Sequence, residues 1–393
     1  MSSAFNLSGR TAIVGVGCSS TAREPDVSVF VHASSALNAA LADARLEKAQ
    51  IDGLISQVGS PRGCDYDSLA QTFGLDVRFC SQTWSHGRFA ATVLTHASLA
   101  VASGIATRVA CIMAMKNSNL GRIGEEDNPF FHEQVRENGG PHGEEGAIGM
   151  LSPIAGAAMA FDLYCRRYAQ DRELLAAIPL TFRDHAILTE DAVARKPLTL
   201  ADYQSARPIV EPLRLLDCSP VGDGAVCVII SAECAAARAV AIIGAQGLRA
   251  GRESFIFGPV GLGMEQQSTH RLTRAESRAQ PVYSMSGTHP ESIDVIGLYD
   301  SFSPLPLYAF EDFGFCGAGE GLDYVQNGRI GLKGDLPTNT NGGQLSHAQL
   351  NGWGQIAELV RQVRGEAGRR QVDNARTAMW ATSAGDALIM ART

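Results

Sequence analysis

The segment Thr11-Ala-Ile-Val-Gly-Val-Gly17 is a short apolar run that ends in glycines, a pattern typical of a buried strand in a parallel sheet. Residues 30–45 follow with small and apolar side chains at helical spacing, and Asp52-Gly-Leu-Ile-Ser56 has the composition of the next strand. Strand, helix and strand in this order form a βαβ unit. The segments therefore predict an α/β fold in which helices cover a largely parallel sheet.

The same alternation of strands and helices returns in the second half of the chain. Helices are predicted over 87–103 and 304–313, and further strands over 108–114, 223–231, 240–244, 293–299, 377–382 and 387–391. Within the first half lies a polar, glycine-punctuated stretch that passes into a helical block. We predict an N-terminal half of residues 1–119 and 209–236, an insertion of residues 120–208, and a C-terminal half of residues 237–393.

Composition excludes several classes of protein. The 393 residues carry 33 Lys and Arg against 41 Asp and Glu, a net charge of −8, which disfavours a nucleic-acid partner. The nine cysteines contain no C-x-x-C pair, so neither a zinc finger nor any other metal site is expected. Free thiols, the lack of a signal-peptide pattern and the lack of a long apolar segment predict a cytoplasmic protein that does not enter a membrane.

Four separated segments carry a resemblance to a known family. They are Thr83-Trp-Ser-His-Gly87, Asp217-Cys-Ser-Pro-Val-Gly-Asp-Gly-Ala225, Leu298-Tyr-Asp-Ser-Phe302 and Asn339-Thr-Asn-Gly-Gly-Gln-Leu-Ser-His-Ala-Gln-Leu-Asn-Gly352. In order and spacing they resemble the thiolase superfamily, in particular its sterol-carrier-type branch and the bacterial lipid-transfer-like aldolases. The resemblance implies a thiolase fold: two similar βαβαβ halves stacked in five layers (αβαβα), with a loop-rich insertion.

The residues that carry out thiolase chemistry differ in this chain. The resemblance places Trp84 at the position of the nucleophilic cysteine, and an indole cannot accept an acyl group. Sliding the alignment to use Cys80 breaks the C-x-x-G spacing. Gln349 takes the place of the histidine that polarises the thioester, and no cysteine follows Cys316 to serve as the second thiol near residues 382–385.

Relatives that cleave steroid side chains by a retro-aldol reaction also lack the nucleophile. They use tyrosines at the positions that match Tyr299 and Gln349, of which only Tyr299 is a tyrosine here. A tyrosine acts as an acid or base when neighbouring groups tune its pKa, and His86, Asp300 and His347 are the candidate neighbours. Gln349 is expected to donate a hydrogen bond to the thioester oxygen.

Every one of these residues also has a structural interpretation. Tyr299 can be a core aromatic, His86 a capping residue, Asp300 the cap of the helix that follows it, and His347 a surface residue. The backbone turn matched to the family motif supplies the candidate substrate-binding residues Gly342, Gly343 and Ser346.

The leading hypothesis is retro-aldol cleavage of a β-hydroxyacyl-CoA whose acyl group is steroid-like, aromatic or branched. An acetyltransferase-like thiolysis or Claisen condensation and a non-catalytic, lipid-binding subunit are the alternatives. Coenzyme A is expected only as part of the substrate, with no other cofactor, and Arg23, Arg62 and Arg122 are candidate contacts for its phosphates. The resemblance also implies a homodimer and a possible small OB-fold, zinc-ribbon partner subunit.

Overall fold

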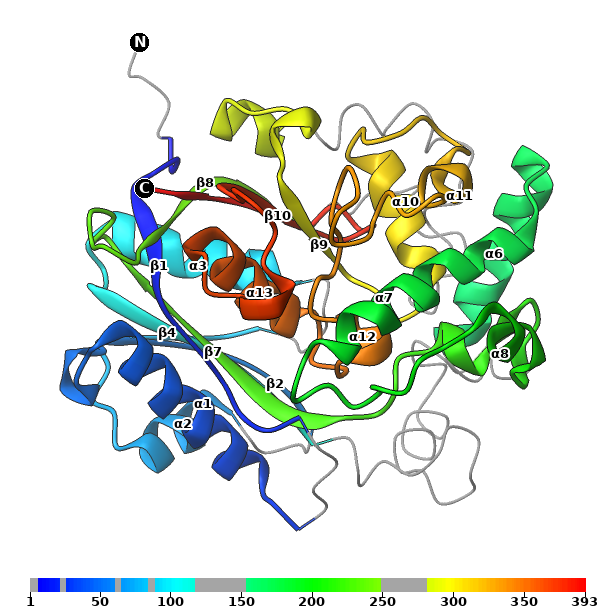
Figure 1. Ribbon diagram of the computed structural model, residues 1–393. Coiled ribbons are helices and arrows are strands. Elements are labelled where there is room, and N and C mark those ends of the chain that lie inside the picture. Colours follow the sequence, from blue (N-terminus) through cyan, green and yellow to red (C-terminus); the bar gives the residue numbers. More distant parts are fainter. Residues whose placement is uncertain (1–5, 22–25, 61–64, 84–88, 117–152, 249–280) are drawn as a thin grey trace, which may run out of the picture.

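A computed structural model describes residues 6–21, 26–60, 65–83, 89–116, 153–248 and 281–393. Within these ranges the main sheet has nine strands, in the order β3-β2-β4-β7-β1-β8-β11-β10-β9 (Figure 1). The strands are β1 (Thr11–Cys18), β2 (Gly53–Ser60), β3 (Phe79–Gln82), β4 (Arg108–Lys116), β7 (Asp223–Ser231), β8 (Val240–Gln246), β9 (Val295–Leu298), β10 (Thr377–Ala381) and β11 (Ala387–Arg392).

The two halves of the sheet repeat one arrangement outward from the β1–β8 junction. The first half runs β1-β7-β4-β2-β3, and the second runs β8-β11-β10-β9 and ends in a parallel bridge between Ile296 and Thr338. A matching aspartate supports the repeat. Asp52, before β2, accepts hydrogen bonds from the backbone N–H groups of residues 107 and 108 at the start of β4. Asp294, before β9, does the same for residues 376 and 377 at the start of β10.

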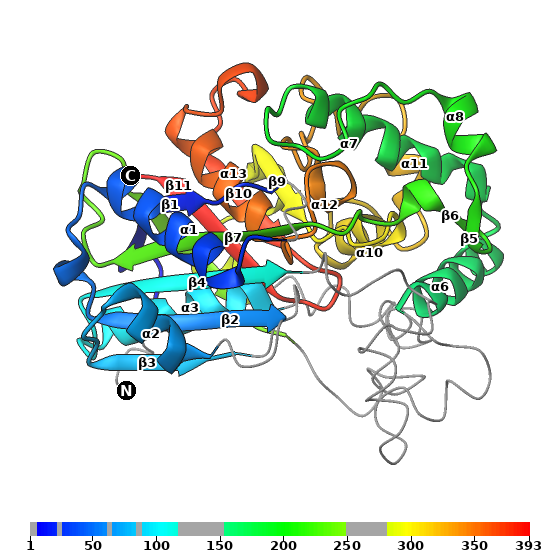
Figure 2. The ribbon, with the colours of Figure 1, turned by 90° about the horizontal axis from the view of Figure 1, so that it is seen from below.

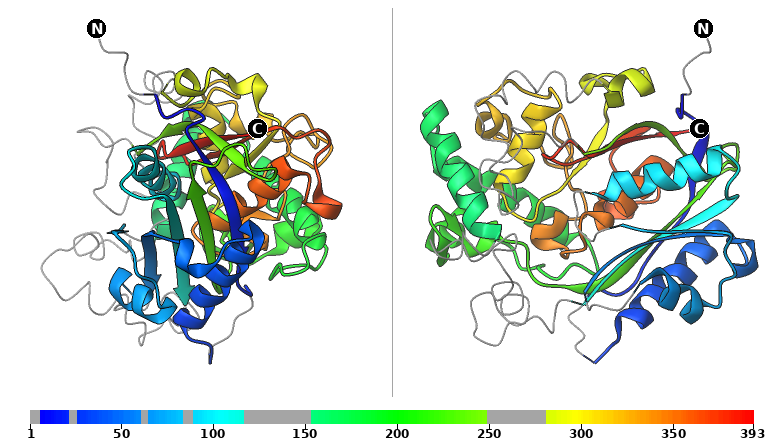
Figure 3. Two further views of the ribbon diagram at one scale, coloured as in Figure 1. Left: turned by 90° about the vertical axis from the view of Figure 1, so that its left-hand side faces the viewer. Right: turned by 180° about the vertical axis from the view of Figure 1, so that it is seen from behind.

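Helices form layers on and between the two parts of the sheet. α1 (Val29–Ala44) and α2 (Tyr66–Phe73) cover the outer face of the first part (Figure 2). The central helices α3 (Ala90–Ala102) and α13 (Trp353–Arg364) lie between the two parts, and helical residues 281–286 pack on the outer side of β8 (Figure 3). The apolar core that surrounds α3 and α13 includes side chains from both halves.

The glycines of β1 are explained by the close approach of α1. A Cβ on Gly15 would lie 2.4 Å from the carbonyl oxygen of Ala40, and one on Gly17 would lie 2.2 Å from that of Ala36. No side chain fits in this contact, because non-bonded heavy atoms cannot pack so closely.

The described part of the insertion packs mainly on the C-terminal half. It holds α6 (Pro153–Tyr168), α7 (Ala177–Ile187) and α8 (Leu200–Ser205), and the hairpin β5 (Pro208–Val210) and β6 (Leu213–Arg214) follows at its C-terminal boundary. The C-terminal half contributes α10 (Pro304–Asp312), α11 (Gly321–Tyr324) and α12 (Gly343–Ser346). The Tyr164 hydroxyl of α6 donates to the Glu311 carboxylate of α10 at 2.6 Å, and α7 packs on α12.

The prediction of a largely parallel sheet is wrong, because the sheet is mixed. Among the described strands, only the pairs β2–β3, β2–β4 and β9–β10 are parallel, whereas β1–β7, β1–β8, β4–β7, β8–β11 and β10–β11 are antiparallel. β7 runs antiparallel to both of its neighbours, β4 and β1, and Lys116 pairs with Asp223 at the end of the β4–β7 ladder. The C-terminal end of β4 and the start of β7 therefore lie at the same end of the ladder, and β7 runs back along β4. Within the described ranges, no helix is long and apolar enough to cross a bilayer.

Two of the described cysteines, Cys111 and Cys227, are core residues, whereas Cys80 is exposed and the others are partly buried. None of the eight forms a disulfide, and Cys111 and Cys227 are completely buried. Burial raises the pKa of both thiols, which disfavours the reactive thiolate.

Candidate functional site

Segments from both halves meet at the ends of β9 and β10. The backbone N–H of Tyr299, directly after β9, donates to the carbonyl of Ala381 at the end of β10, at 3.1 Å. The turn that follows β10 ends at Asp386, whose carboxylate accepts from the N–H of Ala91 in α3 at 2.7 Å. Asn339 binds both backbone groups of Leu298, with distances of 2.7 and 3.0 Å. Hydrogen bonds thus connect three segments to the elements beside them: residues 299–303, 339–353 and 381–386.

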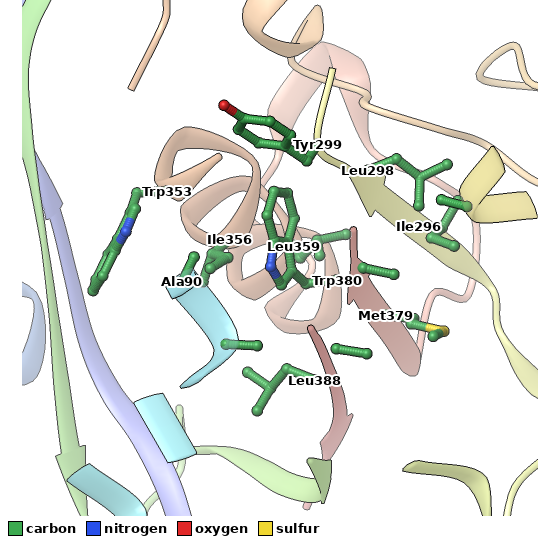
Figure 4. Close-up of a cluster of buried hydrophobic side chains, with 14 of the residues drawn as sticks. Ala90, Ile296, Leu298, Tyr299, Trp353, Ile356, Leu359, Met379, Trp380 and Leu388 are labelled. Atoms are coloured by element: carbon green, nitrogen blue, oxygen red, sulfur yellow. The ribbon is translucent and has the colours of Figure 1, made fainter. Parts of the chain in front are cut away.

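The Tyr299 side chain lies at the edge of the apolar core, and its hydroxyl points away from the core. The side chain is 6% exposed. In Figure 4 the Tyr299 hydroxyl points away from the apolar cluster that contains Trp380, Leu359 and Met379. Ala90, the first residue of α3, lies in the same cluster beside Ile356. The ring therefore packs on the junction of the two halves while the hydroxyl is directed elsewhere.

Asp300 binds the turn of the family motif and does not cap the helix that follows it. Its completely buried carboxylate accepts from the N–H groups of Gln344 and Leu345 at 2.8 and 3.3 Å and from the Gln355 side chain at 2.8 Å. Burial raises the pKa of Asp300 to about 7, while the donated hydrogen bonds oppose the shift. Asp300 thus holds α12 beside Tyr299.

Replacement of Asp300 is expected to change how stability depends on pH. The folded-state pKa of about 7 lies above the ordinary value for an aspartate, about 3.9, so the folded protein retains a proton that the unfolded chain has lost. The corresponding stability is complete below about pH 4 and is lost as the pH rises through 7. The destabilisation by Asp300→Asn should therefore be smaller at pH 8 than at pH 5 in urea unfolding. An equal difference at both pH values would contradict the assignment.

The predicted substrate-binding turn is shaped by its contacts with the rest of the chain. Gly342 has φ 103° and Gly343 φ 62°, and a Cβ on Gly342 would lie 2.6 Å from that of Ala186 in α7. The Ser346 hydroxyl accepts from Arg183 Nε at 3.1 Å. The turn is thus enclosed by α7 of the insertion on one side and by Asp300 on another.

His347 is buried, in contrast to its alternative interpretation as a surface residue. Its Nε2 lies 3.2 Å from the Asp191 carboxylate, and its carbonyl accepts from the Val193 N–H at 2.9 Å. The hydrogen bond from the imidazole lowers the pKa of Asp191 to about 2. His347 therefore connects the motif turn to residues 191–193 of the insertion.

Gln349 is half-buried, two residues beyond this pair. Its backbone N lies 3.6 Å from the position that a Cβ on Gly222 would take, so the stretch before β7 runs beside it. The hydrogen bonds found among the described residues do not include its side-chain amide.

Several predicted positions lie outside the described residues: Trp84, His86, Arg23, Arg62 and Arg122. Cys80 is described, and it lies exposed on the edge strand β3, where partial burial raises the pKa of its thiol. No group of three or more His, Cys, Asp or Glu side chains in the described ranges is arranged to hold a metal ion.

Three residues of this region were missed in the sequence. Arg183 and Asp191 belong to the insertion, and no motif connects them with the turn at 342–347. Asp386 was detectable, since Gly385-Asp386 directly before β11 repeats Gly222-Asp223 at the start of β7, the matching strand of the first half.

Comparisons with known proteins agree with this arrangement. Residues 262–391 match the family model described as thiolase C-terminal domain-like. The chain is 32% identical to the 17-hydroxy-3-oxo-4-pregnene-20-carboxyl-CoA lyase of Mycobacterium tuberculosis, with 91% of this chain and 92% of that protein covered. It is also 32% identical to the steroid side-chain-cleaving aldolase of Thermomonospora curvata, with 91% of each covered. A solved structure, the Ltp2-ChsH2(DUF35) aldolase, is similar with a TM-score of 0.84 and 30% identity over 99% of both chains.

Two repeated α/β halves with paired central helices and a site at their junction define a protein of the thiolase fold, and the fold class predicted from the sequence is confirmed. The chain belongs to the thiolase superfamily, in the branch that contains the steroid side-chain-cleaving aldolases.

Proposed function

We propose that this protein cleaves a carbon–carbon bond of a β-hydroxyacyl-CoA by a retro-aldol reaction. The proposal rests on the position of Tyr299, whose hydroxyl points away from the core at the junction of the two halves. It is supported by the similarity of the chain, over 91% of its length, to two enzymes that cleave carbon–carbon bonds. Trp84, at the nucleophile position of the family, supports a reaction that needs no acyl-enzyme.

The reaction requires one base, one acid and a place for negative charge. The base removes the proton from the β-hydroxyl group. The Cα–Cβ bond then breaks, its electron pair moves into the thioester as an enolate, and the β-carbon leaves as a ketone or aldehyde. Protonation of the enolate at Cα gives a shorter acyl-CoA, so no co-reactant is consumed.

We assign the proton transfer at the hydroxyl or the enolate to Tyr299, because a phenol can serve either as acid or as base. Asp300 and His347 then hold the turn that leads to Gln349 rather than contact the substrate. The Gln349 amide is a neutral donor suited to the thioester oxygen as it gains charge.

Gln349→Ala is expected to lower kcat roughly five- to tenfold, the value of one neutral hydrogen bond. Gln326→Ala is the matched control, since the amide of Gln326 donates to the carbonyls of residues 174 and 322, outside the site. It should leave kcat unchanged. Steady-state kinetics of both variants measure the difference, and equal rates for Gln349→Ala and the parent protein would exclude the assigned role.

The acyl group that we propose is steroid-like, because both curated relatives carry steroid substrates in their names. A small partner subunit belongs to the same proposal, since the similar solved aldolase is named as a complex with a DUF35 protein. Formation of a homodimer stays a prediction.

The deciding experiment supplies the CoA thioester named for the Mycobacterium tuberculosis relative, with and without free CoA. Release of a steroid ketone and a shorter acyl-CoA without free CoA supports the lyase. Product formation that depends on free CoA would instead indicate thiolysis. No turnover, either alone or with a DUF35 partner, would favour a non-catalytic subunit.

A further inference from the structure

The central helix α3 begins without a cap from its own sequence. Its N-cap residue, Phe89, makes no side-chain capping bond, and its first turn contains no acidic residue. Free N–H groups at a buried helix start have to find acceptors elsewhere.

Asp386, from the other half of the protein, supplies the acceptor. One carboxylate oxygen accepts from the Ala91 N–H at 2.7 Å, and the other accepts from the Thr92 hydroxyl at 2.5 Å. The Asp386 side chain is completely buried, so it is not accessible to a substrate that binds at the surface. Burial raises the pKa of Asp386 to about 8, while the hydrogen bonds from Thr92 and Ala91 oppose the shift.

The turn that carries Asp386 is itself fixed on both sides. The Gly385 carbonyl accepts from the side-chain amide of Gln246 in β8, and Oε1 of the same side chain accepts from the Val282 N–H. At the other end of the turn, the Ala381 carbonyl accepts from the N–H of Tyr299. The start of α3 and the backbone of Tyr299 are therefore attached to the same short turn.

We propose that Asp386 is a positioning residue for the reaction assigned to Tyr299, acting through α3 and the turn 381–386. The inference rests on the proposed function. Ala90 and Tyr299 belong to the same apolar core, which also contains Ile356 and Trp380 (Figure 4), so we expect a shift of the α3 start to alter the packing around that ring. Substrate binding does not involve the buried carboxylate.

The test compares Asp386→Ala, Asp386→Asn and the control Asp294→Asn. Asp294 also accepts from two backbone N–H groups, but at the opposite end of the strands. Asp386→Ala should lower kcat by about 10–100-fold, the combined value of its two lost hydrogen bonds, with KM within about twofold. Asp294→Asn should leave both constants unchanged. Asp386→Asn, which keeps the size of the side chain, replaces the alanine variant if the latter does not fold.

Formate provides the readout that a purely structural role would not give. Formate at about 100 mM should restore part of kcat in Asp386→Ala by occupying the vacated carboxylate position at the helix start, and formamide should not. A raised KM with unchanged kcat, or no rescue by formate, would overturn the proposal.

Amide hydrogen exchange at residues 90–93 separates this proposal from the proposed function. It needs no catalytic turnover, and exchange should be faster in Asp386→Ala and slower again with formate. If the parent protein cleaves no β-hydroxyacyl-CoA but exchange responds in this way, the proposed function fails while the capping contact stands. If cleavage is observed and exchange does not respond, the role of Asp386 is excluded.

Discussion

Tyr299→Phe is expected to lower kcat for retro-aldol cleavage by about 10²–10⁴-fold, the range for the loss of a general acid or base. The substitution removes only the hydroxyl, which points away from the core, and the ring that packs on the junction is kept. KM and the unfolding midpoint should therefore change little. Single-turnover kinetics with the β-hydroxyacyl-CoA give the chemical rate directly.

Tyr283→Phe is the matched control for this variant. The Tyr283 hydroxyl is buried and donates to the Phe313 carbonyl at 2.9 Å, so its loss should cost about 1 kcal/mol of stability and leave kcat unchanged. A Tyr299→Phe protein that keeps full activity would remove Tyr299 from the mechanism. The proton transfers would then belong to other groups.

Gly343→Ala is expected to be strongly disruptive. Gly343 has φ 62°, and an added Cβ would lie 2.0 Å from Asp300 Oδ2 and 2.8 Å from the Asn339 amide nitrogen. Backbone strain of about 1–2 kcal/mol adds to the loss of the Asp300 contacts with α12. We expect a destabilisation of about 3–5 kcal/mol in urea unfolding and loss of activity at 25 °C.

Gly365→Ala isolates the backbone contribution. Gly365 ends α13 with φ 77°, and no atom lies within 4 Å of a Cβ placed there. This variant should lose only about 1–2 kcal/mol and keep its activity. Equal effects of the two substitutions would show that the contact with Asp300 contributes nothing.

The elements of the fold were predictable because their signals are local. The apolar run before Gly17 marks a strand that is buried on both faces, and the helical spacing of residues 30–45 marks α1, which covers it. The repetition of this pattern in the second half predicted the two similar halves. The motif around Asn339–Gly352 then indicated the superfamily, a prediction confirmed by the comparisons.

The roles proposed for Tyr299 and Gln349 stay predictions, but their surroundings could not have been predicted in any case. The sequence suggested that Asp300 caps the adjacent helix, whereas its carboxylate binds backbone N–H groups more than 40 residues away. His347 was open to interpretation as a surface residue until residues 191–193 of the insertion were seen to cover it.

By itself, the sequence determined most of the strands, the helices α1, α3 and α10, the repeat of the pattern and the family, because hydrophobic periodicity and motif spacing act within a few turns of the chain. It did not indicate the central helix α13. Only the tertiary structure decided the partners of the buried polar groups. Asp386 and Ala91 are separated by 295 residues. Such pairs form where tertiary packing brings a buried N–H next to a carboxyl group. The hydrophobic periodicity of either segment does not indicate which distant group will be its partner.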